Sequence, residues 1–302
     1  MRLVSMCAAL AVAALIPVRP PAAAGALAPS AGPMRPIAIV PFHRHGKLMV
    51  FDVRIGSNPR KLSFILDSGA SHTVIDSAAA RALRLAAVGH ASAHGTGKGA
   101  VSVARFAALR VAFEGATLDV GEPWGIDLSG VQDLGREDGL IGNELFRRYV
   151  VRLDQDRATM SLYEPASYRP APGVTVVRLI AHKRWIYLAA DLTAGDGTRA
   201  RRELVIDLGS EDSVADALAA HSPQRRSTVL GKGLGADYRG SSGVFARVRI
   251  GPYAWANVWG PAAGPAIGME MLRRFTATFD LTHGTLELVP NAHLRDPVPA
   301  PP

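Results

Sequence analysis

Residues 62–71 read LSFILDSGAS, and this stretch is the most informative about the fold. The apolar run 62–66 predicts a buried strand that ends at Asp67. Gly69, two residues later, permits a sharp turn or the close approach of another backbone. The same order returns at residues 203–210 (ELVIDLGS), where an apolar strand runs into Asp207. We therefore infer an internal repeat in which each half delivers one aspartate on a turn after a strand.

The segments around the two turns follow one another in the same order in both halves. In the first half we expect strands at 48–55, 73–75 and within 100–113, a helix at 77–85, a segment 138–142 (DGLIG), a helical turn at 143–149 and a hairpin of 150–153 with 159–163. In the second half we expect strands at 185–192 and 245–250, a helix at 213–220, a segment 265–268 (PAIG), a helical turn at 269–275 and a hairpin of 277–281 with 285–289.

The composition fits a folded, strand-rich protein of 302 residues. Hydrophobic residues make up 48% and charged residues 20%, which argues against disorder or a fibrous repeat. Aromatic residues are only 6%, while 30 Gly and 21 Pro supply turns for many short strands. We expect an all-β or β-rich fold with short helices.

Both ends of the chain differ in composition from the lobes. Residues 1–24 have a basic Arg2, an apolar run and an Ala-rich cleavage site, which together predict a signal peptide and export to the periplasm or the medium. The run is shorter than the ~20 residues that a membrane span needs. We expect a loose linker at 25–36, an N-terminal lobe at 37–165, a C-terminal lobe at 173–290 and a disordered tail at 291–302.

The two aspartates suggest a specific chemistry. If the halves pack about a pseudo-twofold axis, Asp67 and Asp207 face each other, and carboxylates about 3 Å apart cannot both ionise. One carboxylate can then accept a proton from a bound water, while the other donates a proton to the carbonyl oxygen of an amide. This chemistry needs no metal and no covalent intermediate, and we expect no cofactor.

Residues 67–71 resemble the D-[ST]-G-[AS] active-site loop of aspartic proteases, and residues 138–142 resemble the apolar-apolar-Gly element that follows it. The chain resembles the bacterial retropepsin-like aspartyl proteases over about residues 45–290, with a duplication like that of the bilobal pepsin-type enzymes. The resemblance implies a β-rich fold of two β-barrel-like lobes that are related by a pseudo-twofold axis. The resemblance implies that Asp67 and Asp207 are the catalytic pair. It also implies active-site loop roles for Ser68, Gly69, Ala70, Leu208, Gly209 and Ser210, and supporting roles for Leu140, Ile141, Gly142, Ile267 and Gly268.

The second loop departs from the family pattern at Leu208. In the family the residue after the aspartate is Ser or Thr, whose hydroxyl ties the two loops together; Ser68 matches it, but Leu208 has no hydroxyl. A mobile hairpin over the cleft is also expected, and Gly95, Gly97 and Gly99 fit its position, with residues 231–235 as their mirror. A plain hairpin turn explains either glycine-rich segment equally well.

Other constellations are less specific. His43 and His45 could share one face of a strand, and residues 90–94 hold two more histidines, but no acidic cluster accompanies them and we assign no metal. Ser71 and His72 lack the G-x-S-x-G elbow of a serine hydrolase. The only cysteine is Cys7, so the mature chain has no disulfide. The net charge of +8 is scattered rather than clustered, so no nucleic-acid partner is expected.

We thus expect a monomeric, exported aspartic endopeptidase that acts on an extended peptide or an unfolded protein, with no membrane span once the signal is removed. Two alternatives stay open. The first is an inactive peptide-binding module that keeps the protease fold, which Leu208 motivates. The second is a homodimeric protease that uses Asp67 from two chains. The separation of the Asp67 and Asp207 carboxyl groups discriminates between catalysis and binding, and the mass of the protein in solution tests the homodimer.

Overall fold

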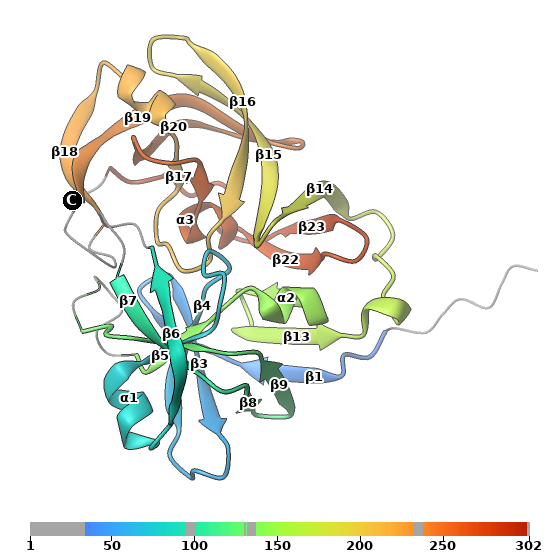
Figure 1. The fold of residues 1–302 in the computed structure, drawn as a ribbon. Helices are drawn as coiled ribbons and strands as arrows, with labels where there is room; N and C mark the ends of the chain where they lie inside the picture. The colour runs from blue at the N-terminus through green and yellow to red at the C-terminus, as the bar shows by residue number, and fades with distance from the viewer. Residues whose placement is uncertain (1–33, 95–100, 130, 132–136, 232–237, 301–302) are drawn as a thin grey trace, which may run out of the picture. The chain divides into compact units, whose positions relative to one another are not determined.

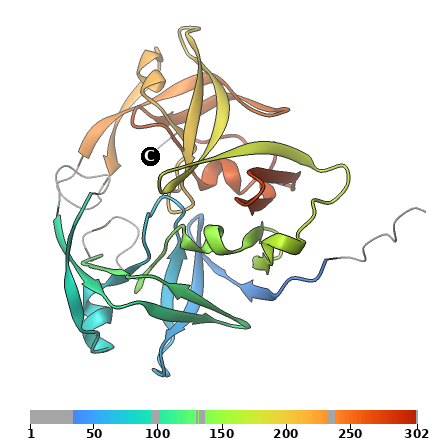
Figure 2. The same ribbon diagram turned by 45° about the vertical axis from the view of Figure 1, so that its right-hand side comes forward.

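Short strands form most of the chain, as the many turn-forming residues predict. The computed structural model describes residues 34–94, 101–129, 131, 137–231 and 238–300. The predicted signal peptide, most of the expected linker, the glycines at 95–99 and most of their mirror segment lie outside the described residues. In Figure 1 and Figure 2 the strands of residues 43–141 run from blue to green, and those of residues 175–290 run from yellow to red.

The first half builds one mixed sheet. Within the described residues ten strands form it, in the order β6-β7-β10-β5-β11-β4-β3-β8-β9, with β2 paired to β3. We call this sheet and its helices the first lobe. Its elements are β2 (His43–His45), β3 (Leu48–Ile55), β4 (Leu62–Leu66), β5 (Val74–Asp76), α1 (Ser77–Ala82), β6 (Ala87–Ala93), β7 (Val101–Phe106), β8 (Leu109–Phe113), β9 (Ala116–Val120), β10 (Trp124–Ile126), β11 (Gly139–Ile141) and α2 (Glu144–Arg148).

The second half, together with β1 and the first half's closing hairpin, builds the other sheet. We call β14 to β23 with their helices the second lobe. Thirteen described strands form this sheet as a whole. Its elements are β1 (Ala38–Pro41), β12 (Val150–Asp154), β13 (Thr159–Tyr163), η1 (Pro165–Ser167), β14 (Thr175–His182), β15 (Trp185–Ala194), β16 (Arg199–Ile206), β17 (Val214–Ala215), η2 (Ala217–His221), β18 (Arg225–Gly231), β19 (Tyr238–Ile250), β20 (Tyr253–Pro261), β21 (Ala266–Ile267), α3 (Met269–Leu272), β22 (Phe275–Asp280) and β23 (Thr285–Pro290).

The internal repeat is visible in the strand pairing. In the first lobe β11 runs parallel to β4 and antiparallel to β5. In the second lobe β21 runs parallel to β16 and antiparallel to β17. Each aspartate therefore follows a strand that is paired in the same way. The closing hairpins meet where β12 pairs with β22, with Arg152 opposite Thr278, so one continuous sheet connects the halves.

The core consists of the apolar sides of these strands. Strand β3 alternates buried and exposed residues toward its end, and its Phe51 is fully buried, as is Phe64 on β4. Phe245, Phe275 and Phe279 fill the second lobe in the same manner. Burial of large apolar side chains on both lobes is the main force that holds the two active-site loops in place.

The helix expected at residues 213–220 is wrong in its first half. Val214 and Ala215 form the strand β17, and only Ala217–His221 turns as a 3-10 helix. Val214 is fully buried and pairs with Ile267 of β21, so sheet pairing in the folded protein overrides the local helical pattern. The helical turn expected at 269–275 likewise ends at Leu272, because Phe275 starts β22.

The tail expected to be disordered from residue 291 is instead held against the second lobe. Arg274 is fully buried, and its guanidinium donates hydrogen bonds to the carbonyl oxygens of His293 (3.2 Å) and Leu294 (3.4 Å). Trp255 Nε1 also donates to Leu294 O at 2.8 Å. A buried guanidinium needs acceptors for its N–H groups, and this segment supplies them. Residues 301 and 302 lie outside the described part.

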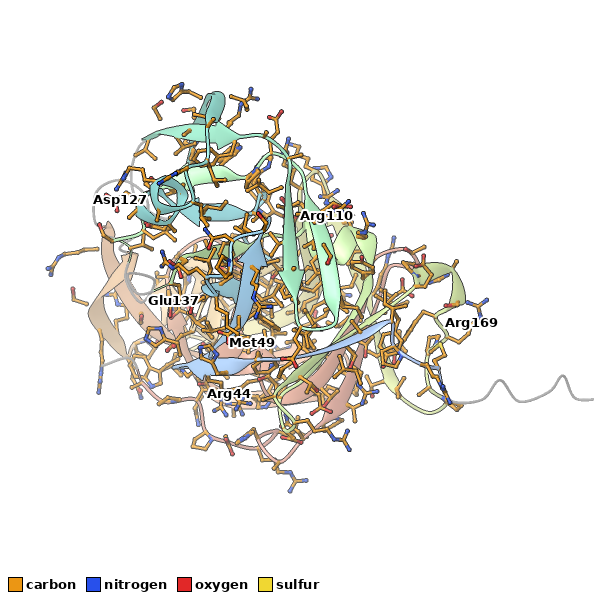
Figure 3. The ribbon with its side chains drawn as sticks, turned by 90° about the horizontal axis from the view of Figure 1, so that it is seen from below. Arg44, Met49, Arg110, Asp127, Glu137 and Arg169 are labelled. Carbon is orange, nitrogen blue, oxygen red and sulfur yellow. The ribbon has the colours of Figure 1, made fainter. Side chains whose placement is uncertain are left out.

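The surface cations are dispersed. Arg44, Arg110 and Arg169 lie at well separated points in Figure 3. Many arginines are paired with nearby carboxylates, such as Arg110 with Asp119 at 2.9 Å. Among the helices of the described residues, none is both long and apolar enough to cross a membrane.

Candidate active site

Asp67 and Asp207 sit at equivalent places in the two lobes. The backbone N–H of Asp67 donates to Ile141 O at 2.9 Å, and that of Asp207 donates to Ile267 O at 2.9 Å. Because Ile141 and Ile267 end the short strands β11 and β21, the apolar-apolar-Gly elements fix the point where each chain turns. Leu140, Ile141 and Ile267 are buried, and Ala266 is half-buried.

The two carboxyl groups meet across the interface of the loops and share a hydrogen bond with each other. Glycine makes this approach possible. A Cβ at Gly69 would lie 2.8 Å from Asp207 Oδ1, and a Cβ at Gly209 would lie 2.5 Å from Asp67 Cγ. Any side chain at either position would therefore push the partner carboxyl away.

The backbone treats the two carboxylates differently. Asp67 Oδ1 accepts hydrogen bonds from the N–H groups of Gly69 (2.8 Å) and Ala70 (3.0 Å). Asp207 Oδ1 accepts one from the N–H of Gly209, at 3.1 Å. Backbone donors favour the ionised form of a carboxyl group. The ionised form is thus better supported at Asp67 than at Asp207.

The pKa values follow this difference. Burial raises the pKa of Asp67 above its ordinary value, and the two backbone donors oppose that rise. Burial, followed by repulsion from the charge on Asp67, raises the pKa of Asp207 to about 8. Because the interaction between the two groups lowers the pKa of Asp67 and raises that of Asp207, the proton that they share resides mainly on Asp207.

Ser68 ties the loops together from one side. Its hydroxyl is fully buried, donates to Ile206 O at 2.6 Å and accepts from the N–H of Leu208 at 3.1 Å. Leu208 occupies the equivalent place in the second loop, where its side chain is buried in the core and offers no polar atom in return. The cross-connection expected from the sequence is thus present in one direction only.

Gly142 and Gly268 allow the supporting elements to pack tightly beneath the loops. A Cβ at Gly142 would lie 2.6 Å from the carbonyl carbon of His72, and one at Gly268 would lie 2.5 Å from Asp212 O. The residues after these glycines bind the loops: Asn143 N donates to Ala70 O at 3.0 Å, and Met269 N donates to Ser210 O at 2.8 Å. Ala70 and Ser210 thus act through their backbones.

A glutamate in each lobe supports its loop, a role that the sequence analysis missed. Glu144 Oε1 accepts from the backbone N–H of Thr73 at 2.8 Å, and burial raises the pKa of Glu144. Glu270 is bound by three cations. The signal was present in the repeat of residues 144–149 and 270–275, where both glutamates occupy the first position.

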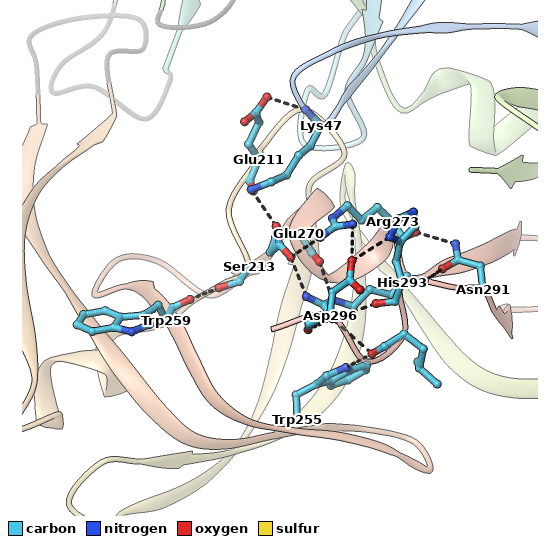
Figure 4. A network of polar contacts seen from close by, with 12 residues as sticks. Lys47, Glu211, Ser213, Trp255, Trp259, Glu270, Arg273, Asn291, His293 and Asp296 are labelled. Atoms are coloured by element: carbon cyan, nitrogen blue, oxygen red, sulfur yellow. Dashed lines mark hydrogen bonds and ion pairs between the residues drawn. The ribbon is translucent and has the colours of Figure 1, made fainter. Parts of the chain in front are cut away.

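Glu270 lies at the centre of the network in Figure 4. Its carboxylate contacts Lys47 Nζ of the first lobe at 2.9 Å, Arg273 at 3.0 Å and Arg274 at 2.7 Å. Burial alone raises its pKa, but these cations lower it overall. Lys47 also donates its backbone N–H to Glu211 Oε1 at 2.8 Å. The network thus connects the first lobe, the second active-site loop and the tail.

Aromatic and basic side chains border the first active-site loop, and this position was not predicted from the sequence. The ring of His72 stacks on Trp124 with centroids 4.3 Å apart. Trp185 Nε1, in the second lobe, donates to Gly69 O at 3.2 Å. No local pattern reveals this contact, because it joins residues 116 positions apart.

The histidines considered as metal ligands have other surroundings. His45 Nδ1 lies 2.8 Å from Glu137 Oε1, and His43 is exposed on β2. Within the described residues no group of three or more His, Cys, Asp and Glu side chains is placed to hold a metal ion. The proposed flap glycines Gly95, Gly97 and Gly99 lie outside the described residues.

A family model of the aspartyl proteases matches residues 51–145. The match runs from β3 into α2, so it contains the Asp67 loop and the DGLIG segment but not the Asp207 loop. No curated protein matches the sequence significantly. The match at residues 51–145, set in a β-rich fold of two lobes, supports an aspartyl protease family of the retropepsin-like kind.

Proposed function

We propose that this protein is an aspartic endopeptidase that hydrolyses peptide bonds with a water molecule activated by Asp67 and Asp207. One observation carries the proposal: two carboxyl groups from pseudo-equivalent loops lie buried against each other and share a hydrogen bond. Burial and the charge on Asp67 raise the pKa of Asp207 to about 8. Such a pair offers a base and an acid at the same pH. The match to the aspartyl protease family supports a protease function in general.

The unequal surroundings of the two carboxyl groups assign their roles. Asp67, supported by two backbone donors, is the ionised member. It takes a proton from the water as the water oxygen attacks the carbonyl carbon. Asp207, whose proton is retained, donates it to the carbonyl oxygen. The resulting gem-diol collapses when the proton held by Asp67 passes to the amide nitrogen and the C–N bond breaks. One diol hydroxyl returns its proton to Asp207, which leaves an amine, a carboxylic acid and the starting protonation of the pair.

The substrate is a peptide in extended conformation, bound along the loops. Extended peptides are bound in clefts by backbone hydrogen bonds, with pockets for alternate side chains. Export, a monomeric state and an unfolded protein substrate remain part of this proposal and rest on the sequence.

The test uses three variants of the chain: Asp67→Asn, Asp207→Asn and Asp52→Asn. Asp52 is a matched control, because it lies on β3 and pairs only with exposed Lys61 at 3.3 Å. We expect cleavage of an unfolded protein, read by mass spectrometry from pH 4 to 9, to be lost in the first two variants and kept in the third. Cleavage that survives both dyad substitutions would contradict the mechanism. Loss only in Asp67→Asn would favour a homodimer.

A second candidate is a peptide-binding module without activity. The one-sided tie through Ser68 favours it, because a looser loop aligns the carboxyl groups less well. Calorimetric binding of peptides with no product after long incubation, in wild type as in both dyad variants, would support this candidate.

A further inference from the structure

The turn between β14 and β15 brings two cations to the border of the first active-site loop. Lys183 and Arg184 are exposed, and the next residue, Trp185, donates its indole N–H to Gly69 O at 3.2 Å. Gly69 is the residue whose Cα faces the Asp207 carboxyl group. The turn is thus connected to the proposed dyad through Gly69.

Arg184 is fixed at both of its ends. The side-chain amide of Asn143, which is fully buried, donates to Arg184 O. The Arg184 guanidinium contacts His72 Nε2, and the His72 ring stacks on Trp124. Burial, together with the charge of Arg184, lowers the pKa of His72, so Nε2 accepts a guanidinium N–H. An arginine held in this way loses little freedom when it binds a further group.

The cation in the equivalent turn of the first lobe has a carboxylate partner, unlike the two cations in this turn. His45 and Leu48 pair around Gly46 and Lys47, as His182 and Trp185 pair around Lys183 and Arg184. Lys47 is neutralised by Glu270 at 2.9 Å. In the described part of the chain neither Lys183 nor Arg184 forms an ion pair with a carboxylate.

The neighbourhood adds positive rather than negative charge. Arg147 of α2 donates to Lys183 O at 3.0 Å and carries a third cation to the same turn. The nearest carboxylate on α2, Glu144, is engaged with the N–H and hydroxyl of Thr73. A positioned guanidinium with free N–H groups and no carboxylate partner is a site for a carboxylate from outside the chain.

We propose that Arg184 binds a carboxylate of the substrate, so that the enzyme prefers peptides with an acidic group on the side of the dyad bordered by residues 69–72. This inference rests on the proposed function and adds a substrate class to it. The carboxylate is either an Asp or Glu side chain or the C-terminus of a short peptide. Both sources offer the same two oxygen atoms to the guanidinium fork.

The test compares matched peptides. A cleavable peptide is made with Glu or Gln at each position flanking the scissile bond, and with a free or amidated C-terminus, and kcat/KM is measured for each. We expect at least one Glu/Gln or acid/amide pair to differ by about 10-fold in wild type. The first kind of pair identifies a side chain and the second identifies the terminus.

The variants assign the preference to Arg184. Arg184→Gln is expected to bring the ratio close to one, Arg184→Lys to keep part of it, and Arg184→Glu to invert it toward Lys-containing peptides. The control Arg199→Gln, at the exposed first residue of β16, should keep the wild-type ratio. Thermal unfolding of each variant shows that it is folded. A ratio of one in wild type, or a ratio unchanged in Arg184→Gln, overturns the proposal.

A binding arm separates this inference from the proposed function. The same peptides, carrying a fluorophore, are titrated into Asp207→Asn, which does not cleave them, and into the double variant with Arg184→Gln. If wild type cleaves nothing, the proposed function fails, but a carboxylate-dependent affinity lost with Arg184→Gln still supports the inference. Equal affinities for acidic and neutral peptides contradict it.

Discussion

The two active-site loops are copies of one design that have become unequal. The first loop offers the Ser68 hydroxyl to its partner and two backbone N–H groups to Asp67. The second loop has the buried apolar Leu208 in place of a hydroxyl, and gives Asp207 one backbone N–H. Both aspartates follow equivalent strands, yet the unequal number of backbone donors favours Asp67 as the base and Asp207 as the acid.

The two segments at 144–149 and 270–275 show the same divergence. Their sequences share Glu-x-x-Arg-Arg, yet the side chain of Arg148 is 52% exposed and that of Arg274 is fully buried. The tail at 291–296 covers Arg274, whereas in the described part of the chain Arg148 contacts the side chains of Tyr149 and Asp119. The shared local sequence forms a short helix in both lobes, whereas the tail at 291–296 buries the arginine of the second lobe.

Gly209→Ala is expected to have the largest effect on activity. Its Cβ would lie 2.5 Å from Asp67 Cγ, so the two carboxyl groups must separate. A displacement of this size is expected to lower kcat by about 100-fold or more. Steady-state kinetics measure the loss, and Gly264→Ala, whose Cβ would meet open space, is the matched control. Near-normal kcat in Gly209→Ala would mean that the carboxyl groups need not touch.

Glu270→Gln is expected to destabilise the protein more than Glu144→Gln does. The first change removes the charge that three cations share, one of them fully buried. The second removes an acceptor whose partners are an uncharged N–H and a hydroxyl. We expect about 3 kcal/mol in the free energy of unfolding for Glu270 and about 1 for Glu144. Denaturant unfolding measures both, and equal losses would contradict the difference between the lobes.

Ser68→Ala should cost about 1 to 3 kcal/mol of stability, because it leaves Ile206 O and the N–H of Leu208 without a partner. The same change should lower kcat by roughly 10-fold through looser alignment of the carboxyl groups. Ser92→Ala, on the exposed side of β6, is the control for a lost hydroxyl. An unchanged unfolding midpoint in Ser68→Ala would show that the loops are held by packing alone.

Asp207→Asn is expected to stabilise the fold by on the order of 1 to 2 kcal/mol near neutral pH while abolishing cleavage. The folded pKa of about 8 lies above the unfolded value of 3.8, so the folded state retains a proton that the unfolded state releases between these values. Wild-type stability therefore falls as pH rises through that window, and asparagine removes the loss. Thermal unfolding at pH 4, 6 and 8 should show a gain that grows with pH; a gain independent of pH would contradict the raised pKa.

Much of this organisation is predictable from the sequence because the motifs are local. The strand before Asp67, the turn at Gly69 and the DGLIG segment are each readable from a few residues. The strand at β17 was missed because its pairing with β21 depends on residues about 50 positions away, as was the contact of Trp185 with Gly69. The tail was misjudged because its composition resembles a linker, whereas the buried Arg274 requires its carbonyl groups.

The central claim is that Asp67 and Asp207 share one proton at neutral pH. Carbon-13 NMR of the aspartate carboxyl groups, assigned with Asp67→Asn and Asp207→Asn, measures this directly and needs no substrate. We predict that one proton stays on the pair at pH 7 and is released near pH 8, with the larger chemical-shift change at Asp207. Two carboxyl groups that both titrate by pH 5 would contradict the account.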